Sequence, residues 1–436
     1  MAEKELIILG GGLAALSTAY FAKKKGYVST ILEKSDRLGG LLRTEKVEDF
    51  YFDVGGSHII FSKNQRLVDF IVNEILDGKT ITHKRDARIF YKGNFIRYPF
   101  ENGIFMLPQE ERLEILLDFI EAKINVEKGI KPTNFKEFLT LGFGKALAQK
   151  YLIPYNEKIW KTPLEEIGLD WVGRLPNPSI EAVVKSAMGI PTEGYVHQSI
   201  FHYPKDGGIE ALAHKLAEKT KPNVKLHTEI KKVSLEDSRR IYISHSQGEI
   251  EAKKVVSTIP LNILVELLSP APPKEIKEAA KKLKWTSLIT VAVVVKGNAP
   301  PYHWVYIPNK EIIFHRLSFP SNYYKPDEKG LFTVLVEISS FRNKDPWTLT
   351  NEEIENRVRN DLEKMGLCKQ NEIVTAKAYR FNYGYPIYTK DWKDNREKIE
   401  KYLQTKGILI TGRFGSWQYI NMDKTIELAE KTVEAL

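Results

Sequence analysis

Three features of the sequence predict an α/β fold built from more than one domain. A glycine-rich turn near the N-terminus stands between a strand-like and a helix-like segment, residues 65–192 carry mostly helical periodicity, and residues 288–337 contain short β-rich runs. We therefore expect a discontinuous Rossmann-type dinucleotide-binding domain, a helical cap domain and an antiparallel β-sheet substrate domain. A chain of 436 residues, 42% of them hydrophobic, can bury the cores of two or three domains.

The glycine-rich turn has the surroundings that a dinucleotide site requires. Residues 5–9 predict a buried strand, and residues 13–25 predict the helix that follows the turn. Gly10 permits the tight turn, Gly12 lets the backbone approach a pyrophosphate, and Ala15 lets helix and strand pack closely. A second strand over 28–32 ends at Glu33, whose carboxylate can accept a hydrogen bond from a ribose hydroxyl. The pattern predicts FAD or NAD rather than NADP.

The next segment, EKSDRLGGLLRT at 33–44, resembles the extended flavin signature of the amine oxidase and protoporphyrinogen oxidase superfamily. The resemblance implies FAD as the cofactor and a loop that wraps its pyrophosphate. Segments near 203–208, 233 and 412–413 resemble the parts of that superfamily in which the chain returns to the flavin. The FAD contacts that the resemblance adds to those above are Arg37, Gly39, Gly40, Leu41, Val233, Gly412 and Arg413.

Helical and strand patterns divide the rest of the chain. Residues 209–218 and 424–436 predict helices of the FAD-binding domain, and residues 224–233, 255–260 and 407–411 supply its later strands. Residues 110–127 and 134–150 predict cap helices, and 290–295, 304–307, 312–317 and 332–337 predict strands of the antiparallel sheet. The expected FAD-binding domain comprises 1–64, 203–286 and 372–436, the helical cap 65–202, and the sheet domain 287–371.

Motifs along nearly the whole chain are similar, in order and approximate spacing, to those of the UDP-galactopyranose mutases. They are FDVGGSHIIFS at 52–62, RYPFEN at 97–102, PYNEKIW at 154–160, WVGR at 171–174, FHR at 314–316, GYP at 384–386 and GRFGSWQY at 412–419. The resemblance implies an isomerase that interconverts the pyranose and furanose forms of a UDP-hexose, with galactose the expected sugar. In that chemistry, N5 of reduced FAD attacks the anomeric carbon and UDP leaves, without net oxidation.

The resemblance also implies roles for individual residues. Arg174 and Arg316 match a clamp on the diphosphate, which suits the fixed charge of a guanidinium, and Arg413 matches an arginine near flavin and sugar. His58 matches a histidine that positions and tunes the flavin. Structural salt bridges and core packing are the alternatives for these residues and for the expected substrate contacts. Those contacts are Tyr98, Phe100, Asn102, Asn156, Trp160, Tyr306, Tyr385 and Tyr419.

Three departures from the family pattern leave base and sugar specificity open. Ser57 adds a residue between the glycine pair and His58, and the segment after Tyr419 reaches Asn421 about two residues early. Glu101 stands where the eukaryotic-type branch carries glutamine. An ionised carboxylate accepts hydrogen bonds but cannot donate one to a base carbonyl, so Glu101 could instead pair with lysine or arginine.

Composition narrows the possible partners, cellular location and functional classes of the protein. The formal net charge of +9 is spread among acidic residues, which indicates a solvated surface, an anionic substrate or weak contact with a membrane surface, but no nucleic-acid partner. Cys368 is the only cysteine, so we expect no disulfide, no metal cluster and a cytoplasmic location. No apolar run reaches membrane-spanning length. NAD(P)H is a candidate transient reductant. An oxidase or dehydrogenase for an amine, porphyrinogen or polyene, and a catalytically silent flavin-binding protein, remain the rival classes.

Overall fold

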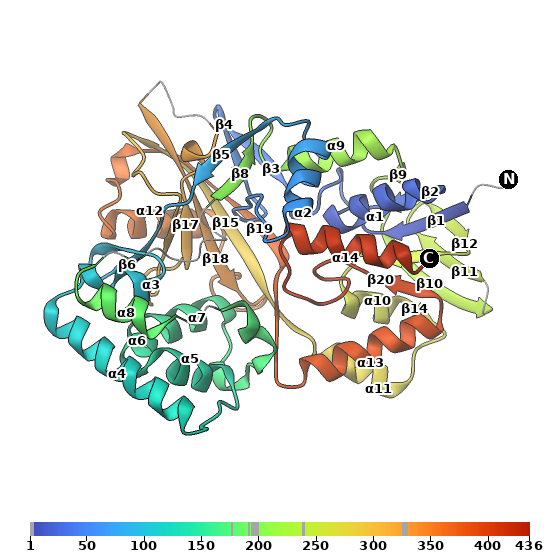
Figure 1. Ribbon diagram of the computed structural model, residues 1–436. Coiled ribbons are helices and arrows are strands. Elements are labelled where there is room, and N and C mark those ends of the chain that lie inside the picture. Colours follow the sequence, from blue (N-terminus) through green and yellow to red (C-terminus); the bar gives the residue numbers. More distant parts are fainter. Residues whose placement is uncertain (1–3, 176–177, 191, 193–199, 238–239, 325–329) are drawn as a thin grey trace.

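The computed structural model describes residues 4–175, 178–190, 192, 200–237, 240–324 and 330–436, except for the side chains of residues 174, 236 and 237. Figure 1 shows a half built around a parallel sheet, with β1, β2 and α1, beside a half built around a large mixed sheet that contains β15 and β18. Helices α4, α5 and α7 lie below the mixed sheet in this view, and α12 lies at its outer side.

The parallel sheet has the strand order β20-β13-β1-β2-β9, and all neighbouring strands run parallel. Residues 6–9 of β1 are buried, as is typical of a parallel sheet covered by helices on both faces. Helix α1 packs against both α9 and α14. The bounds are β1 Lys4–Leu9, β2 Tyr27–Leu32, β9 Asn223–Lys225, β13 Val255–Ser257, β20 Ile408–Ile410, α1 Leu13–Lys24, α9 Glu210–Thr220 and α14 Met422–Glu434. The predicted assembly of this sheet from separated segments is confirmed.

A smaller sheet follows with the order β12-β11-β10-β14. The run 224–233, which we expected to supply strand, divides between β9 and β10 of two different sheets. His227 between them has φ +52°, and the amides of His227 and Thr228 donate to the carbonyls of Ser35 and Glu33. The bounds here are β10 Ile230–Asp237, β11 Arg240–His245, β12 Gly248–Ala252, β14 Leu268–Ser269, α10 Leu261–Leu267, α11 Lys274–Lys282 and α13 Trp392–Thr405.

The large mixed sheet has the order β19-β15-β18-β17-β16-β6-β7. Its pairs are antiparallel except for β16 with β6. The strand expected over 312–317 is wrong in its extent, because only residues from Arg316 onward pair with β18. The bounds are β6 Ala87–Tyr91, β7 Asn94–Arg97, β15 Lys284–Lys296, β16 Trp304–Tyr306, β17 Arg316–Ser318, β18 Leu331–Ser340, β19 Ile373–Ile387 and α12 Asn351–Lys364.

Strands β6, β7 and β19 lie in ranges where the sequence indicated helical cap or FAD-binding domain, yet they extend the mixed sheet. Each side of this sheet depends on pairing between distant segments, which local periodicity does not report. Around it lie the two-stranded pairs β3 with β4 and β5 with β8, and the helical layer. Their bounds are β3 Thr44–Val47, β4 Phe50–Asp53, β5 Thr80–Lys84, β8 Ile200–Pro204, α2 Gln65–Asp69, α3 Phe100–Gly103, α4 Gln109–Glu127, α5 Phe135–Phe143, α6 Lys145–Leu147, α7 Ile153–Trp160 and α8 Ile180–Ala187.

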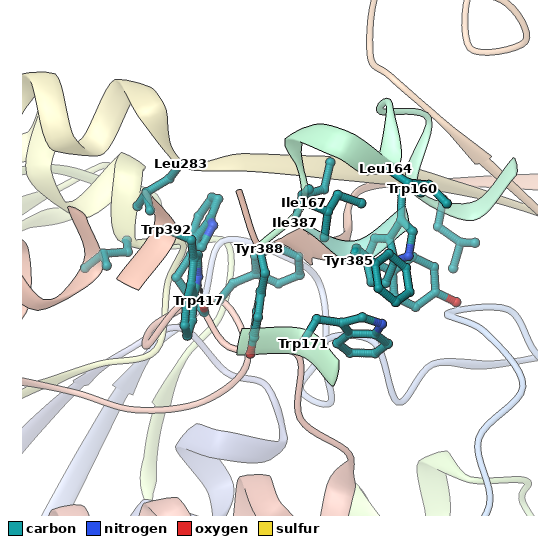
Figure 2. Close-up of a cluster of buried hydrophobic side chains, with 14 of the residues drawn as sticks. Trp160, Leu164, Ile167, Trp171, Leu283, Tyr385, Ile387, Tyr388, Trp392 and Trp417 are labelled. Atoms are coloured by element: carbon teal, nitrogen blue, oxygen red, sulfur yellow. Dashed lines mark hydrogen bonds between the residues drawn. The ribbon is translucent and has the colours of Figure 1, made fainter. Parts of the chain in front are cut away.

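An aromatic cluster joins the two halves. Figure 2 shows Trp160, Trp171 and Tyr385 at one end and Trp392 and Trp417 at the other, with Tyr388 between them. The rings of Tyr388 and Trp392 stack 3.8 Å apart, and Nε1 of Trp392 donates to the carbonyl of Trp417 at 2.9 Å. Burial of such large rings is a strong stabilising contribution. The cluster therefore fixes α7 and the end of β19 against the segment that follows β20.

Candidate active site

Glycine backbone lines the meeting point of β1, α1 and the loop after β2. The amide of Gly39 donates to the carbonyl of Gly11 at 2.9 Å, and a Cβ on Gly40 would lie 3.1 Å from Cα of Gly12. A Cβ on Gly412 would lie 2.5 Å from Cβ of Ala14. Side chains are thus excluded where the first turn of α1 presents its free N–H groups. Such a cradle fits the pyrophosphate of a dinucleotide.

The carboxylate of Glu33 stabilises this cradle through hydrogen bonds. Its Oε2 accepts from the amide of Gly11 at 2.6 Å, and its Oε1 accepts from the amide and the hydroxyl of Ser35, both at 2.8 Å. A carboxylate has about four lone-pair sites, so it can still accept a further hydrogen bond. The carboxylate therefore braces the glycine turn whether or not it also meets a ribose.

The other residues expected at the cofactor are held by local contacts, by burial or by a backbone conformation that favours glycine. Arg37 pairs with Glu45, and its Nε lies 3.5 Å from Oε1 of Glu210. The carbonyl of Leu41 would lie 2.0 Å from a Cβ on Gly55, so the loop between β2 and β3 closely approaches the loop before His58 through backbone. Val233 is fully buried in β10. Gly10 has φ +93°, a conformation that favours glycine.

The segment from Gly55 to His58 is anchored to the mixed sheet. Oγ of Ser57 accepts from Nε1 of Trp304 at 3.0 Å and lies 3.1 Å from the Tyr323 hydroxyl, and the Ser57 amide donates to Glu337. Nδ1 of His58 is buried and finds no hydrogen-bond partner among the described residues. Burial, together with the nearby charges of Arg413 and Arg316, lowers the pKa of His58 to about 3. The imidazole is therefore neutral at physiological pH.

Arg316, the first residue of β17, forms a two-pronged ion pair with Glu337 of β18. Its Nε and Nη2 donate to the carboxylate at 2.9 and 2.7 Å, and the Glu337 side chain is fully buried. Burial alone would lower the pKa of Arg316, but the carboxylate outweighs burial and raises it. Nη1 makes no hydrogen bond to another described residue. Glu337 therefore holds the guanidinium group only along its Nε and Nη2 edge.

In the described part of the chain, Arg413 is held by carbonyl groups and not by a carboxylate. Its Nε and Nη2 donate to the carbonyl of Ile420 at 3.1 and 3.0 Å, and its Nη1 donates to that of Gly384 at 3.3 Å. The guanidinium lies 5.0 Å from the ring centroid of Tyr419 and 5.9 Å from that of Tyr385. Carbonyls and rings fix its direction but do not cancel its charge.

Tyrosines gather beside these arginines. The rings of Tyr98 and Tyr306 lie 4.7 Å apart, and the Tyr306 hydroxyl accepts from Nη2 of Arg85 at 2.8 Å. The guanidinium of Arg85 also lies 5.3 Å from the ring centroid of Tyr98. Sequence reasoning missed Arg85 and Glu337. A lone carboxylate within the apolar run of β18 was the signal that could have revealed Glu337.

The remaining predicted substrate contacts are largely buried and engaged. Phe100 is fully buried and stacks on Tyr151, and Nδ2 of Asn102 donates to Thr192. Oδ1 of Asn156 accepts from Nε1 of Trp160 at 3.1 Å, one turn of α7 apart. Trp160 and Tyr385 lie at one end of the aromatic cluster (Figure 2), and the ring of Tyr419 packs against both.

The structure describes the side chain of Glu101 but not that of Arg174. Glu101 is buried in α3, and its charge contributes to raising the pKa of Tyr98, after burial and the neighbouring Tyr306. The side chain of Arg174 lies outside the described part of the chain. None of the helices in the described ranges combines the length and the apolar character that crossing a lipid bilayer requires.

Comparison with known proteins places this chain in a family. The profile of the family described as flavin containing amine oxidoreductase matches residues 13–435. An L-amino-acid oxidase of Crotalus adamanteus is 26% identical over 255 residues, covering 54% of this chain and 46% of the oxidase. A UDP-galactopyranose mutase of Mycoplasma pneumoniae is 24% identical over 204 residues, covering 44% of this chain and 50% of the mutase. The chain spans about half the length of the curated relatives it matches.

Solved structures extend the likeness over the whole chain. Reduced UDP-galactopyranose mutase superimposes with a TM-score of 0.89 at 23% identity, over 100% of this chain and 94% of the mutase chain. A putative protoporphyrinogen oxidase from Exiguobacterium sp. 255-15 gives a TM-score of 0.78 at 20% identity, over 100% and 99% of the two chains. At these identities the likeness shows the fold, and this fold confirms the predicted fold class.

Proposed function

The chain belongs to the family of flavin containing amine oxidoreductases, and from that premise we propose that it is an isomerase of nucleotide sugars, similar to UDP-galactopyranose mutase. FAD is its cofactor. The proposed reaction is the redox-neutral interconversion of the pyranose and furanose forms of a UDP-hexose, with galactose the expected sugar. The enzyme would work with its flavin reduced.

The glycine cradle would hold the pyrophosphate of FAD through the N–H groups at the start of α1, with Gly12 and Gly40 allowing close approach. Arg37, Glu33, Leu41 and Val233 would complete the walls. When bound and reduced, FAD supplies through N5 the nucleophile that the anomeric carbon requires. The neutral imidazole of His58 would position the ring without adding charge.

One observation carries the proposal: Arg316 and Arg413 converge on the loop that ends at His58. Both guanidinium groups lie close enough to His58 to lower its pKa. A departing diphosphate needs fixed positive charge that does not reorganise during the reaction. Glu337 orients Arg316 while Nη1 stays available, and carbonyl groups orient Arg413 without neutralising it. Arg174 is proposed as the second half of the diphosphate clamp.

The surrounding side chains would bind the nucleotide. Tyrosine hydroxyls beside the arginines can donate to phosphate oxygens, and aromatic faces with a nearby amide can hold a base. Their present contacts, ring on ring and Trp160 on Asn156, would keep them in fixed orientations. The proposed substrate contacts are Tyr98, Phe100, Asn102, Asn156, Trp160, Tyr306, Tyr385 and Tyr419.

An oxidase for an amine-bearing acid is the second candidate. The similarity to an L-amino-acid oxidase favours it, and a guanidinium such as Arg316 can bind a substrate carboxylate as readily as a phosphate. The two candidates differ in the flavin they need, because an oxidase begins with oxidised flavin and a mutase with reduced flavin.

Anaerobic incubation with UDP-galactofuranose tests the proposal. Protein reduced with dithionite should yield UDP-galactopyranose by chromatography, whereas oxidised protein should not. NADPH in place of dithionite tests the expected reductant. Peroxide release from L-amino acids in air, without sugar conversion by reduced protein, would favour the oxidase and contradict the mutase.

A further inference from the structure

A cavity of about 570 Å³ lies between α7, α12 and the segment 310–313. We call it the α7–α12 cavity. Pro154, Glu157 and Lys158 of α7 line it together with Lys161, which follows the helix, and Arg357, Asn360, Asp361 and Lys364 of α12 line the opposite wall. Among the described residues that line it, none belongs to the site proposed above. Its volume falls in the range of small-molecule sites.

Most of the charges in this cavity are already paired. Glu157 binds Lys310 at 3.2 Å, Asp345 binds Arg357 at 3.3 Å, and Asp361 binds Lys364 at 3.1 Å. Asp361 also accepts from the amide of Ile313 at 2.7 Å, and Glu311 accepts from the side-chain amide of Asn309 at 2.9 Å. The carboxylates that line the cavity therefore have partners.

Lys158 and Lys161 have no such partners. The ammonium of Lys158 donates only to the backbone carbonyls of Ile307 and Asn309, at 3.2 and 2.6 Å, which leaves one of its three N–H groups. Lys161 makes no hydrogen bond or ion pair with any residue in the described ranges. Burial lowers the pKa of Lys161, and it lowers that of Lys158 to about 7. The charge of Lys161 also lowers the pKa of Lys158, whereas the charges of Asp361 and Glu311 raise it.

Two lysine side chains on one cavity wall, without a bound carboxylate, keep both of their charges at lower cost when an anion joins them. We propose that the α7–α12 cavity is a second anion site, in which Lys158 and Lys161 bind the phosphate group of a small molecule. A phosphate suits ammonium groups because each is a compact point charge, and its three terminal oxygens can accept from both. Ile312 and Pro346 offer apolar surface to the rest of the molecule.

The proposal does not rest on the mutase activity, and its test is local to the two lysines. FAD-loaded protein is treated with acetic anhydride with and without inorganic phosphate, and each lysine is quantified by peptide mass spectrometry. Saturating UDP is present in a parallel series, to fill the proposed diphosphate site near Arg316. Phosphate should protect Lys158 and Lys161 in both series, while Lys274 on α11, with a side chain 89% exposed, should react equally in all samples.

Two variants sharpen the test. Lys161→Gln should weaken phosphate protection of Lys158 by about tenfold or more, as expected for the loss of a charged hydrogen-bond donor. Lys310→Gln, on the same cavity but already paired with Glu157, should retain it. Absence of protection at Lys158 and Lys161 in the wild-type protein would overturn the site. Equal protection by acetate at the same concentration would overturn the assignment to phosphate.

Discussion

Arg316 and Glu337 face each other across neighbouring strands of the mixed sheet, joined by both prongs of the guanidinium. Removing one partner of such a buried pair leaves an uncompensated charge. We expect Glu337→Gln to lower the free energy of unfolding in urea by about 3–5 kcal/mol. The additional change Arg316→Met should recover part of the loss.

The surface pair of Arg66 and Glu430 provides the control, since its atoms are as close, at 2.6 Å, but the arginine is 57% exposed. Glu430→Gln should cost about 0–1 kcal/mol. Equal losses of unfolding free energy in the two variants would show that burial of the Glu337 carboxylate does not determine the cost of removing its charge.

Gly412→Ala should abolish FAD retention. Its Cβ would lie 2.5 Å from Cβ of Ala14 at the start of α1, and its φ of +86° is unfavourable for alanine. Gly26→Ala is the matched control, because Gly26 has φ +79° but nothing lies within 4 Å of an added Cβ. Both variants carry backbone strain of about 1–2 kcal/mol, so only Gly412→Ala should lose flavin absorbance per protein. Comparable flavin content in the two would contradict the close approach.

His58 should stay neutral between pH 5 and 8. Its folded pKa of about 3 lies below the value of an unfolded histidine, so this residue contributes stability that is present above about 6.5 and is lost as pH falls toward 3. The NMR signal of its Cε1–H, identified by its absence in His58→Gln, should not move across pH 5–8. A midpoint near pH 6.5 would mean that the imidazole is not buried beside Arg413 and Arg316.

Ser57→Ala should destabilise the loop before His58. It removes the acceptor of the Trp304 indole N–H, which leaves that buried donor unpaired at a cost of about 1–3 kcal/mol, and it removes one of the partners of the Tyr323 hydroxyl. Ser246→Ala, on an exposed turn, should change the free energy of unfolding by less than about 0.5 kcal/mol. Similar changes in the free energy of unfolding of both variants would show that Ser57, the residue added relative to the family pattern, is only a spacer.

Arg413→Lys should lower kcat/KM for UDP-galactofuranose on the order of 10²-fold if the proposed reaction is correct. Lysine keeps the charge but cannot bridge the carbonyls of Ile420 and Gly384 while lying over Tyr419. Arg396→Lys, on α13, tests for a general effect of the substitution, since Arg396 binds Glu400 and the carbonyl of Ser416. Loss of activity in Arg396→Lys alone would argue against the assignment.

Local sequence patterns were sufficient to predict the parallel-sheet half of the fold. They were less informative about which residues meet in the candidate site. Strand, glycines and helix from Lys4 to Lys24 follow from short-range spacing, and they appear where expected. The mixed sheet depends on distant pairings, so β19 was missed although it spans Ile373–Ile387. The same limit hid Glu337, because its meeting with Arg316 is set by the register of β17 on β18. Arg85 lacked any local signal, since β6 reaches the tyrosines only through its parallel pairing with β16.

The contact between Gly412 and Ala14 bears on how the enzyme matures. One wall of the glycine cradle comes from the first helix and the other from the segment after β20, with almost the whole chain between them. A ribosome-bound nascent chain therefore presents an unfinished pocket until β20 has emerged and paired with β13. We therefore expect flavin loading to come late in biosynthesis, and a lesion that prevents β20 from docking to yield apoprotein even when the N-terminal motif is intact.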